Sequence, residues 1–141
     1  MNALRPTIPI ANFDTQPFWD GCARGELLLQ RCGECQAYRH PPSPICPRCL
    51  SEKHEWVAAS GRGKVYTFVV VRETRARGWD KMVPYVLAVV ALDEGPRILT
   101  NLVNVAPEAV TIEMPVAVTF AELDGTTQLP LFQPQGTEAS R

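Results

Sequence analysis

Four cysteines arranged as two Cys-x-x-Cys pairs constrain this chain more than any other feature. The first pair is Cys32 and Cys35, and the second pair, Cys46 and Cys49, follows after ten intervening residues. A gap of two residues lets one tight turn direct both sulfurs at one ion, and two such turns supply the four tetrahedral ligands that zinc prefers. We therefore predict one structural zinc site, whose closed ligand shell cannot activate water.

The same cysteines leave two alternatives open. Iron in a rubredoxin-like site would use the same ligand set, whereas free thiols or two disulfides would need no metal. No secretory leader is visible near the N-terminus, so we expect a cytoplasmic protein, and reduced thiols in that compartment favour metal over disulfides. The fifth cysteine, Cys22, is expected to be a small core residue. His40 and His54 flank the cysteine pairs and are expected to pack or lie on the surface.

The composition is that of an ordinary globular protein. The chain has 141 residues, of which 45% are hydrophobic and 21% charged. Its net charge of −1 gives no general attraction to nucleic acid or to anionic membranes. No apolar run approaches the roughly 18 residues that a membrane helix needs, so we expect no membrane partner.

The region before the cysteines, residues 1–31, is predicted to be an extension, a short helix and a lead-in strand. Thr15-Gln16-Pro17 is typical of a helix start, with proline in the first turn. Gly25 is expected to end the helix, and residues 26–31 form the predicted strand. The zinc ribbon is then expected over residues 32–60.

The chain changes character near Gly61-Arg62-Gly63 and becomes rich in β-branched residues. Strands are predicted over residues 64–72, 85–92, 97–103, 116–123 and 129–132, with turns at 94–96 and 124–125. Five strands of this size predict a small OB-fold-like barrel over residues 61–134, with a sandwich fragment as the alternative. The predicted core positions on these strands are Val65, Val69, Val71, Val86, Ala88, Val90, Val116 and Val118. The polar tail begins at Gln133, and residues 135–141 are expected to be disordered.

Four cations gather between the first two predicted barrel strands. They are Arg72, Arg75, Arg77 and Lys81, and Trp79 lies among them. This set is suited to clamping phosphates and stacking on the adenine of coenzyme A. Contact with a partner's acidic surface, or a mobile solvated loop, are the alternatives.

The N-terminal region is unusually apolar for a segment so close to a terminus. The large apolar residues there exceed what a short helix easily buries, and they are Ile8, Ile10, Phe13, Phe18 and Trp19. They form either part of a partner interface or a cover over the ribbon and the barrel.

The ordered combination of motifs resembles the OB-fold acyl-CoA-associated proteins with an N-terminal rubredoxin-like zinc ribbon. The resemblance covers most of the chain and departs at Glu113, where the family often has glycine before Met-Pro-Val. The matching motifs are Phe18-Trp19, Gly25-Glu26-Leu27, Gln30-Arg31-Cys32, Cys35, Pro41-Pro42, Cys46-Pro47-Arg48-Cys49, Gly63-Lys64-Val65-Tyr66-Thr67-Phe68, Leu92-Asp93-Glu94-Gly95 and Leu129-Pro130-Leu131-Phe132-Gln133-Pro134.

The resemblance implies a non-enzymatic subunit that works beside a thiolase-superfamily or related acyl-CoA enzyme. Such proteins support acyl transfer or carbon–carbon bond chemistry on coenzyme A thioesters, some hold part of the acyl-CoA, and relatives accompany aldolases and hydratases in steroid degradation. The implied cofactor is structural zinc, with acyl-CoA as a further ligand.

Two other classes of function compete with this hypothesis. Zinc ribbons and OB-folds also bind single-stranded nucleic acid, and Tyr66 and Phe68 are the candidate stacking residues. An independent coenzyme A thioester enzyme is the weakest hypothesis, because the chain has no nucleophile elbow, phosphate-binding glycine loop or dinucleotide fingerprint. Asp93 and Glu94 adjoin Gly95-Pro96 and are expected to be turn residues.

Overall fold

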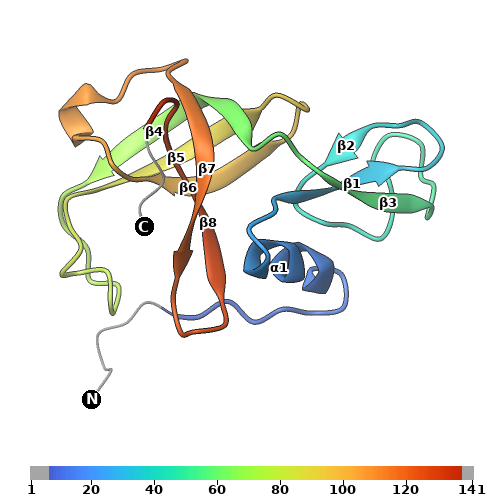
Figure 1. Cartoon of the computed structure of the whole chain (residues 1–141), viewed down its shortest axis with the longest axis horizontal. Helices are drawn as coiled ribbons and strands as arrows, with labels where there is room; N and C mark the ends of the chain where they lie inside the picture. Colours follow the sequence, from blue (N-terminus) through green and yellow to red (C-terminus); the bar gives the residue numbers. More distant parts are fainter. Residues whose placement is uncertain (1–6, 138–141) are drawn as a thin grey trace.

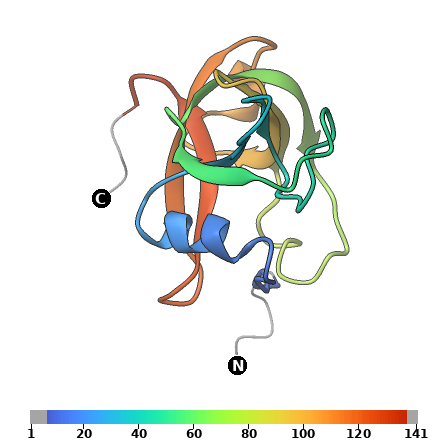
Figure 2. The same ribbon diagram turned by 90° about the vertical axis from the view of Figure 1, so that its right-hand side faces the viewer.

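The computed structural model describes residues 7–137 and divides them into a three-stranded sheet and a five-stranded barrel. One short helix, α1, packs against strands of both parts, β1 and β8 (Figure 1). Viewed from the side of the small sheet, that sheet lies in front of the barrel, with α1 below it (Figure 2). The predicted class, mostly β with a short N-terminal helix, is confirmed. The elements are α1 Gln16–Ala23, β1 Leu28–Cys32, β2 Tyr38–Arg39, β3 His54–Ala58, β4 Arg62–Val71, β5 Tyr85–Leu92, β6 Arg97–Leu102, the 3-10 turn η1 Pro107–Ala109, β7 Pro115–Glu122 and β8 Gln128–Pro134.

Helix α1 begins and ends as its sequence predicts. Pro17 lies in its first turn, where the absent N–H costs nothing. Gly25 follows the helix with a φ of 77°, a left-handed conformation that glycine adopts without strain. The helix buries Phe18 and Cys22.

The small sheet has the antiparallel order β2-β1-β3, with β1 in the centre. Strand β1 pairs with β3 along its whole length, from Leu28 opposite Ala58 to Cys32 opposite His54. The sequence did not predict β3, because its partly polar residues become a strand only by pairing with β1. This pairing fixes the backbone position of Cys32, the first cysteine of the first pair, at the end of β1.

The barrel closes in the order β4-β5-β6-β8-β7. Closure depends on an antiparallel contact of Arg62–Lys64 with Pro115–Ala117 and on a parallel contact between Leu102 and Phe132. A closed five-stranded barrel confirms the OB-like prediction and excludes the sandwich fragment. The turn at 93–96 joins β5 to β6, as predicted for Asp93 and Glu94.

The core continues from the barrel into the N-terminal region. Val65, Val90, Val116 and Phe132 are completely buried in the barrel. Phe18, Cys22, Leu27 and Leu29 belong to the same apolar cluster. The helix and β1 are therefore anchored to the barrel by apolar burial, which is the main favourable term in folding.

A β-bulge at Tyr66 corrects one part of the core prediction. Val65 pairs with Val90 but Thr67 pairs with Val89, so β4 carries one extra residue. The bulge reverses the alternation, and Phe68 and Val70 pack against the core. Val69 is 55% exposed and Val71, two residues on, shares its outer face. The prediction that Val69 and Val71 face the core was wrong.

Two further positions differ from sequence expectation near the end of the barrel. Gln133 is buried within β8, so a polar tail beginning there was wrong. Gln135 donates its backbone N–H to Pro115 O at 3.1 Å, so order continues past β8. Residues 138–141 of the predicted tail lie outside the described residues.

The residue at which the chain departs from the family pattern, Glu113, has a φ of 67°. This is the left-handed conformation that favours the glycine often found there in the family.

Within residues 7–137, no helix is long and apolar enough to cross a membrane.

Candidate metal centre and binding surfaces

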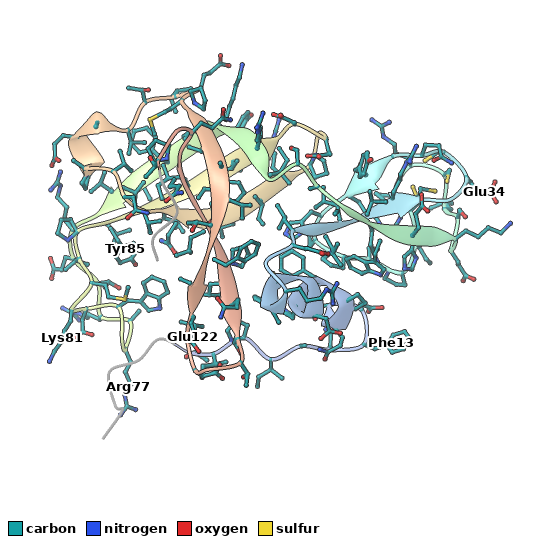
Figure 3. The ribbon with its side chains drawn as sticks, in the orientation of Figure 1. Phe13, Glu34, Arg77, Lys81, Tyr85 and Glu122 are labelled. Atoms are coloured by element: carbon teal, nitrogen blue, oxygen red, sulfur yellow. The ribbon has the colours of Figure 1, made fainter. Side chains whose placement is uncertain are left out.

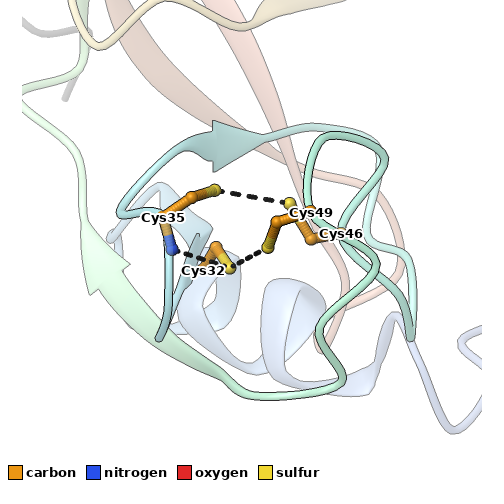
Figure 4. A group of neighbouring side chains, drawn as sticks. All are labelled: Cys32, Cys35, Cys46 and Cys49. Atoms are coloured by element: carbon orange, nitrogen blue, oxygen red, sulfur yellow. Dashed lines mark hydrogen bonds between the residues drawn. The ribbon is translucent and has the colours of Figure 1, made fainter.

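The four predicted ligands meet at the end of the small sheet. Their Sγ atoms all lie within 4.8 Å of one another, with Cys32 to Cys49 at 3.5 Å and Cys35 to Cys46 at 3.6 Å (Figure 4). Sulfurs bound tetrahedrally at about 2.3 Å from zinc would be about 3.8 Å apart. A disulfide requires about 2.05 Å, so these distances match a shared ion and not two disulfides. The four cysteines form a zinc site.

Backbone N–H groups prepare the first sulfur of each pair for metal binding. The N–H groups of Glu34 and Cys35 donate to Cys32 Sγ at 3.4 and 3.5 Å. The Cys35 N–H, followed by that of Glu34, lowers the pKa of Cys32 to about 6. The N–H groups of Cys49 and Arg48 likewise lower the pKa of Cys46. Zinc binds thiolates, so stabilising the charged sulfur favours binding.

The two pairs are built alike. Each second cysteine is followed by a residue in the left-handed conformation, Gln36 with a φ of 65° and Leu50 with a φ of 63°. Gln36 N–H donates to Cys32 O at 3.2 Å, and Leu50 N–H donates to Cys46 O at 2.9 Å. These bonds close two equivalent turns around the metal position. A Cys-x-x-Cys spacing predicts this geometry.

At Cys49 the neighbouring sulfurs act against ionisation. The Ser51 N–H lowers the pKa of Cys49, but the nearby Cys32, burial, and the other two cysteines together outweigh it and raise that pKa to about 11. Four thiolates at this separation need a cation between them. When bound, zinc supplies that positive charge, with Cys32, Cys35, Cys46 and Cys49 as its ligands.

A buried polar network positions the loop between the two pairs. Arg39 Nε donates to Gln30 Oε1 at 2.8 Å and its Nη2 donates to Ser43 O at 2.7 Å. Ser43 N–H also donates to Gln30 Oε1 at 2.8 Å. The network ties β1 and β2 to the loop that leads into the second pair. Sequence reasoning missed Gln30 and Arg39, because buried polar partners are recognised only once the chain is folded.

The two histidines that flank the cysteine pairs, and the fifth cysteine, lie against other side chains. The His40 ring lies 5.2 Å from the Phe18 ring, and burial lowers the pKa of His40. The His54 ring lies 6.2 Å from that of Trp56. Cys22 is completely buried in the apolar core, and this burial raises the pKa of its thiol to about 12, so Cys22 is the small core residue that the sequence predicted.

The loop between β4 and β5 separates its predicted ligand-binding residues. Arg72 pairs with Glu108 at 3.8 Å. Arg77 and Lys81 project from the far end of the loop, away from the strands (Figure 3), and Arg75 is also exposed. Trp79 instead lies 5.1 Å from the Tyr85 ring, so it belongs to the wall of the barrel more than to the cationic tip.

The structure also divides the apolar N-terminal residues. Ile10 and Phe13 are 92% and 95% exposed, and Ile8 is 36% exposed. Figure 3 shows Phe13 projecting into solvent. Trp19 is half-buried and its ring is nearly perpendicular to that of Phe18. Phe18 is a core residue and has no surface to offer a partner.

The two aromatic residues considered for nucleic-acid stacking do not form one platform. Tyr66 lies on the outer face, where the Arg97 guanidinium covers its ring at 3.8 Å. Phe68 packs inward against the core. Bases stack on rings that share one open surface, which this pair lacks.

Comparison with known families matches both parts of the chain. Residues 19–55 match "ChsH2, rubredoxin-like zinc ribbon domain", and residues 56–121 match "ChsH2, C-terminal OB-fold domain". A DUF35 domain-containing scaffold protein of Methanocaldococcus jannaschii is 38% identical over 69% of this chain and 69% of its own length.

Longer relatives contain this unit as one part. A probable enoyl-CoA hydratase alpha subunit of Thermomonospora curvata is 40% identical over 94% of this chain. The 3-oxo-4,17-pregnadiene-20-carboxyl-CoA hydratase alpha subunit of Mycobacterium tuberculosis is 40% identical over 81% of it. The chain spans only 40% and 36% of the lengths of these two proteins.

Comparison with a solved structure supports the same family over almost the whole length of both chains. The protein titled "Ltp2-ChsH2(DUF35) aldolase" superposes with a TM-score of 0.83 and 38% identity, covering 90% of this chain and 98% of that one. Sequence, zinc site and barrel topology therefore agree, and the chain belongs to the ChsH2 family of DUF35 proteins, with a zinc ribbon followed by an OB-fold barrel.

Proposed function

We propose that this chain is a non-catalytic accessory subunit that binds an acyl-CoA-processing enzyme of the thiolase superfamily or a related class. The observation that carries the proposal is the likeness to a chain of the structure titled "Ltp2-ChsH2(DUF35) aldolase". The Methanocaldococcus jannaschii relative, which is named a scaffold protein, supports a structural role. The acyl-CoA named for the mycobacterial relative supports steroid or lipid side-chain metabolism as the setting.

The geometry of the metal centre supports an accessory role. Four cysteines fill the tetrahedral positions of a zinc ion, which leaves no position for water or substrate. The buried thiol of Cys22 has a raised pKa, which opposes nucleophilic attack. The zinc therefore stabilises the ribbon and does no chemistry on a thioester.

The N-terminal segment is the proposed site of contact with the enzyme. Ile10 and Phe13 are almost fully exposed, and aromatic residues flanked by apolar ones are typical of interface centres. Ile8 and the half-buried Trp19 extend this surface toward α1. We leave Phe18 out of the proposed contact, because its role is to hold α1 on the core.

We further propose that the loop between β4 and β5 contacts the phosphates of acyl-CoA. Arg75, Arg77 and Lys81 place cations at its exposed tip, and cations bind phosphate oxygens by charge-assisted hydrogen bonds. Arg72 is held by Glu108 at the base of the loop. Trp79 could stack on the adenine of coenzyme A only through the part of its ring that Tyr85 does not cover.

The partner proposal is tested by purifying the tagged chain at its native level and identifying what elutes with it. We expect an acyl-CoA enzyme in fixed stoichiometry, and we expect Ile10→Glu with Phe13→Glu to abolish its recovery. Ile112→Glu, a charge introduced at another exposed apolar residue, is the matched control. Recovery of single-stranded nucleic acid with a steep salt dependence would favour the competing function instead.

The ligand proposal is tested by titrating the complex with acyl-CoA. Arg75→Glu with Lys81→Glu is expected to weaken binding, most strongly at low salt, where exposed charges are least screened. Thermal stability should be unchanged, because both side chains are exposed. The matched control is Lys53→Glu, directly before β3 of the ribbon sheet, and this sheet lies at the other end of the molecule from the loop (Figure 1). Equal affinity of the loop variant and the wild type at low salt would rule out phosphate contact by this loop.

A further inference from the structure

An apolar groove of about 390 Å³ lies between the N-terminal segment, α1, the loop after β2 and the outer side of β6 and β8. A second hollow of about 330 Å³ adjoins it toward Tyr85 and Leu87. Trp79, Leu99, Thr100 and Asn101 line both hollows. We call the two together the Trp79 groove. Its size is that of a small-molecule site, for which about 300–1,000 Å³ is typical.

The walls of the Trp79 groove are rigid. Five rings line it, those of Phe18, Trp19, His40, Trp79 and Tyr85. Phe18 holds the rings of Trp19 and His40 at centroid distances of 5.2 Å each. Pro41, which follows His40, is also part of the wall. Rings and prolines have few rotatable bonds, so the groove keeps its shape without a ligand, and binding costs little ordering of the protein.

A few neutral polar groups converge on this apolar surface. Asn101 Nδ2 donates to Val86 O at 3.1 Å, and its side-chain oxygen has no hydrogen-bond partner among the described residues. His40 is largely buried, and burial lowers its pKa, so its neutral imidazole offers one donor and one acceptor. None of the described residues that line the groove carries a charged side chain.

We propose that the Trp79 groove binds a rigid, ring-containing apolar molecule that carries one hydroxyl or carbonyl group. Flat aromatic walls favour rings through edge and offset-stacked contacts. The side chains of His40 and Asn101 favour an uncharged polar group over a carboxylate or an ammonium, which would lose its hydration there without a counter-charge. This site is built within one chain and does not depend on the proposed partner.

The test uses 2-naphthol and the isolated full-length chain, followed by the three tryptophan indole N–H resonances in a nitrogen–proton correlation spectrum. Trp19 and Trp79 line the groove, whereas Trp56 lies on β3 in the ribbon sheet. We expect saturable shifts at Trp19 and Trp79 and none at Trp56. Weaker binding is expected for naphthalene, which lacks the hydroxyl, and for 1-decanol, which has the hydroxyl on a flexible chain.

A matched pair of variants locates the site. Leu99 is 67% exposed and lines both hollows, so Leu99→Gln should weaken 2-naphthol binding by about tenfold, as loss of a small apolar contact does in other pockets. Ile112→Gln, at a residue that is 55% exposed and outside the groove, should leave binding unchanged.

Three results would overturn the inference. Equal shifts at Trp56, or unchanged affinity of Leu99→Gln, would place binding elsewhere. Binding of 1-decanol at least as tight as that of 2-naphthol would contradict the rigid, ring-containing ligand. Absence of any saturable shift would contradict the site itself, while leaving the partner proposal unaffected, because no partner is present in this experiment.

Discussion

The zinc ribbon and the barrel are held together by different forces. From residue 33 to residue 60, the only buried side chains are those of Arg39 and Cys46. The barrel instead surrounds a continuous apolar cluster that includes Val65, Val90 and Phe132. The ribbon therefore depends on four bonds to one ion, whereas the barrel depends on many small apolar contacts.

This difference shows how the zinc ribbon can keep a folded structure without an apolar core of its own. Metal binding supplies about 10–16 kcal/mol in zinc-finger peptides, which is enough to fold them. Helix α1 and β1 belong to the barrel's core through Phe18, Leu27 and Leu29. The start of β1 is therefore stabilised by apolar packing against the barrel, whereas the rest of the ribbon sheet beyond β1 depends on the metal.

The largest expected effect is the loss of zinc. Cys46→Ser should remove the metal and disorder residues 33–53, because few buried side chains remain to hold them, while the barrel stays folded. Metal analysis and hydrogen exchange measure both parts. Cys22→Ala, which removes a buried thiol outside the metal site, is the control and should keep one zinc per chain. A ribbon that stays protected from exchange without metal would show that its fold does not depend on zinc.

Loss of apolar volume in the barrel should lower the stability of the barrel and leave the zinc site intact. Phe132 is completely buried, so Phe132→Ala should lower the free energy of unfolding by roughly 3–5 kcal/mol without changing the zinc content. Leu50→Ala in the ribbon, at a side chain that is 75% exposed, should change stability by less than about 0.5 kcal/mol. Chemical denaturation compares the two. A similar cost for both variants would mean that the ribbon has a core the structure does not show.

The bulge in β4 gives a smaller and sharper test. Val65→Thr should cost roughly 1–3 kcal/mol, because it buries a hydroxyl without a partner. Val69→Thr should be nearly neutral, since Val69 is 55% exposed. Without the bulge both residues would face the core, so equal losses for the two variants would show that β4 alternates regularly.

The smallest expected effect concerns a single backbone conformation. Glu113 is exposed with a φ of 67°, and the left-handed region costs a non-glycine residue about 1–2 kcal/mol. Glu113→Gly should therefore be neutral or stabilise the barrel slightly in thermal denaturation. Glu122→Gly, the same change at the end of β7, should destabilise it by about 0.5–1 kcal/mol. Destabilisation by Glu113→Gly to the same extent would mean that this conformation is not strained.

Sequence patterns predicted the parts of this molecule that local chemistry determines. The spacing of Cys32, Cys35, Cys46 and Cys49 was sufficient for the metal site, and β-branched residues located the barrel strands to within a few residues. The bulge at Tyr66 was missed because Val69, Val70 and Val71 are all apolar, so the sequence does not show which of them face the core. Strand β3, the Gln30–Arg39 network and the Trp79 groove were missed because each depends on segments brought together by folding.

We propose that this chain assists an acyl-CoA enzyme without catalysing a reaction itself. The most direct measurement is turnover of the partner's thioester substrate by the chain alone, the partner alone and the two together. We expect no turnover by the chain alone, and we expect the activity or solubility of the partner to fall when the chain is withheld. Turnover of the thioester by the isolated chain at a rate comparable to that of the complex would contradict it.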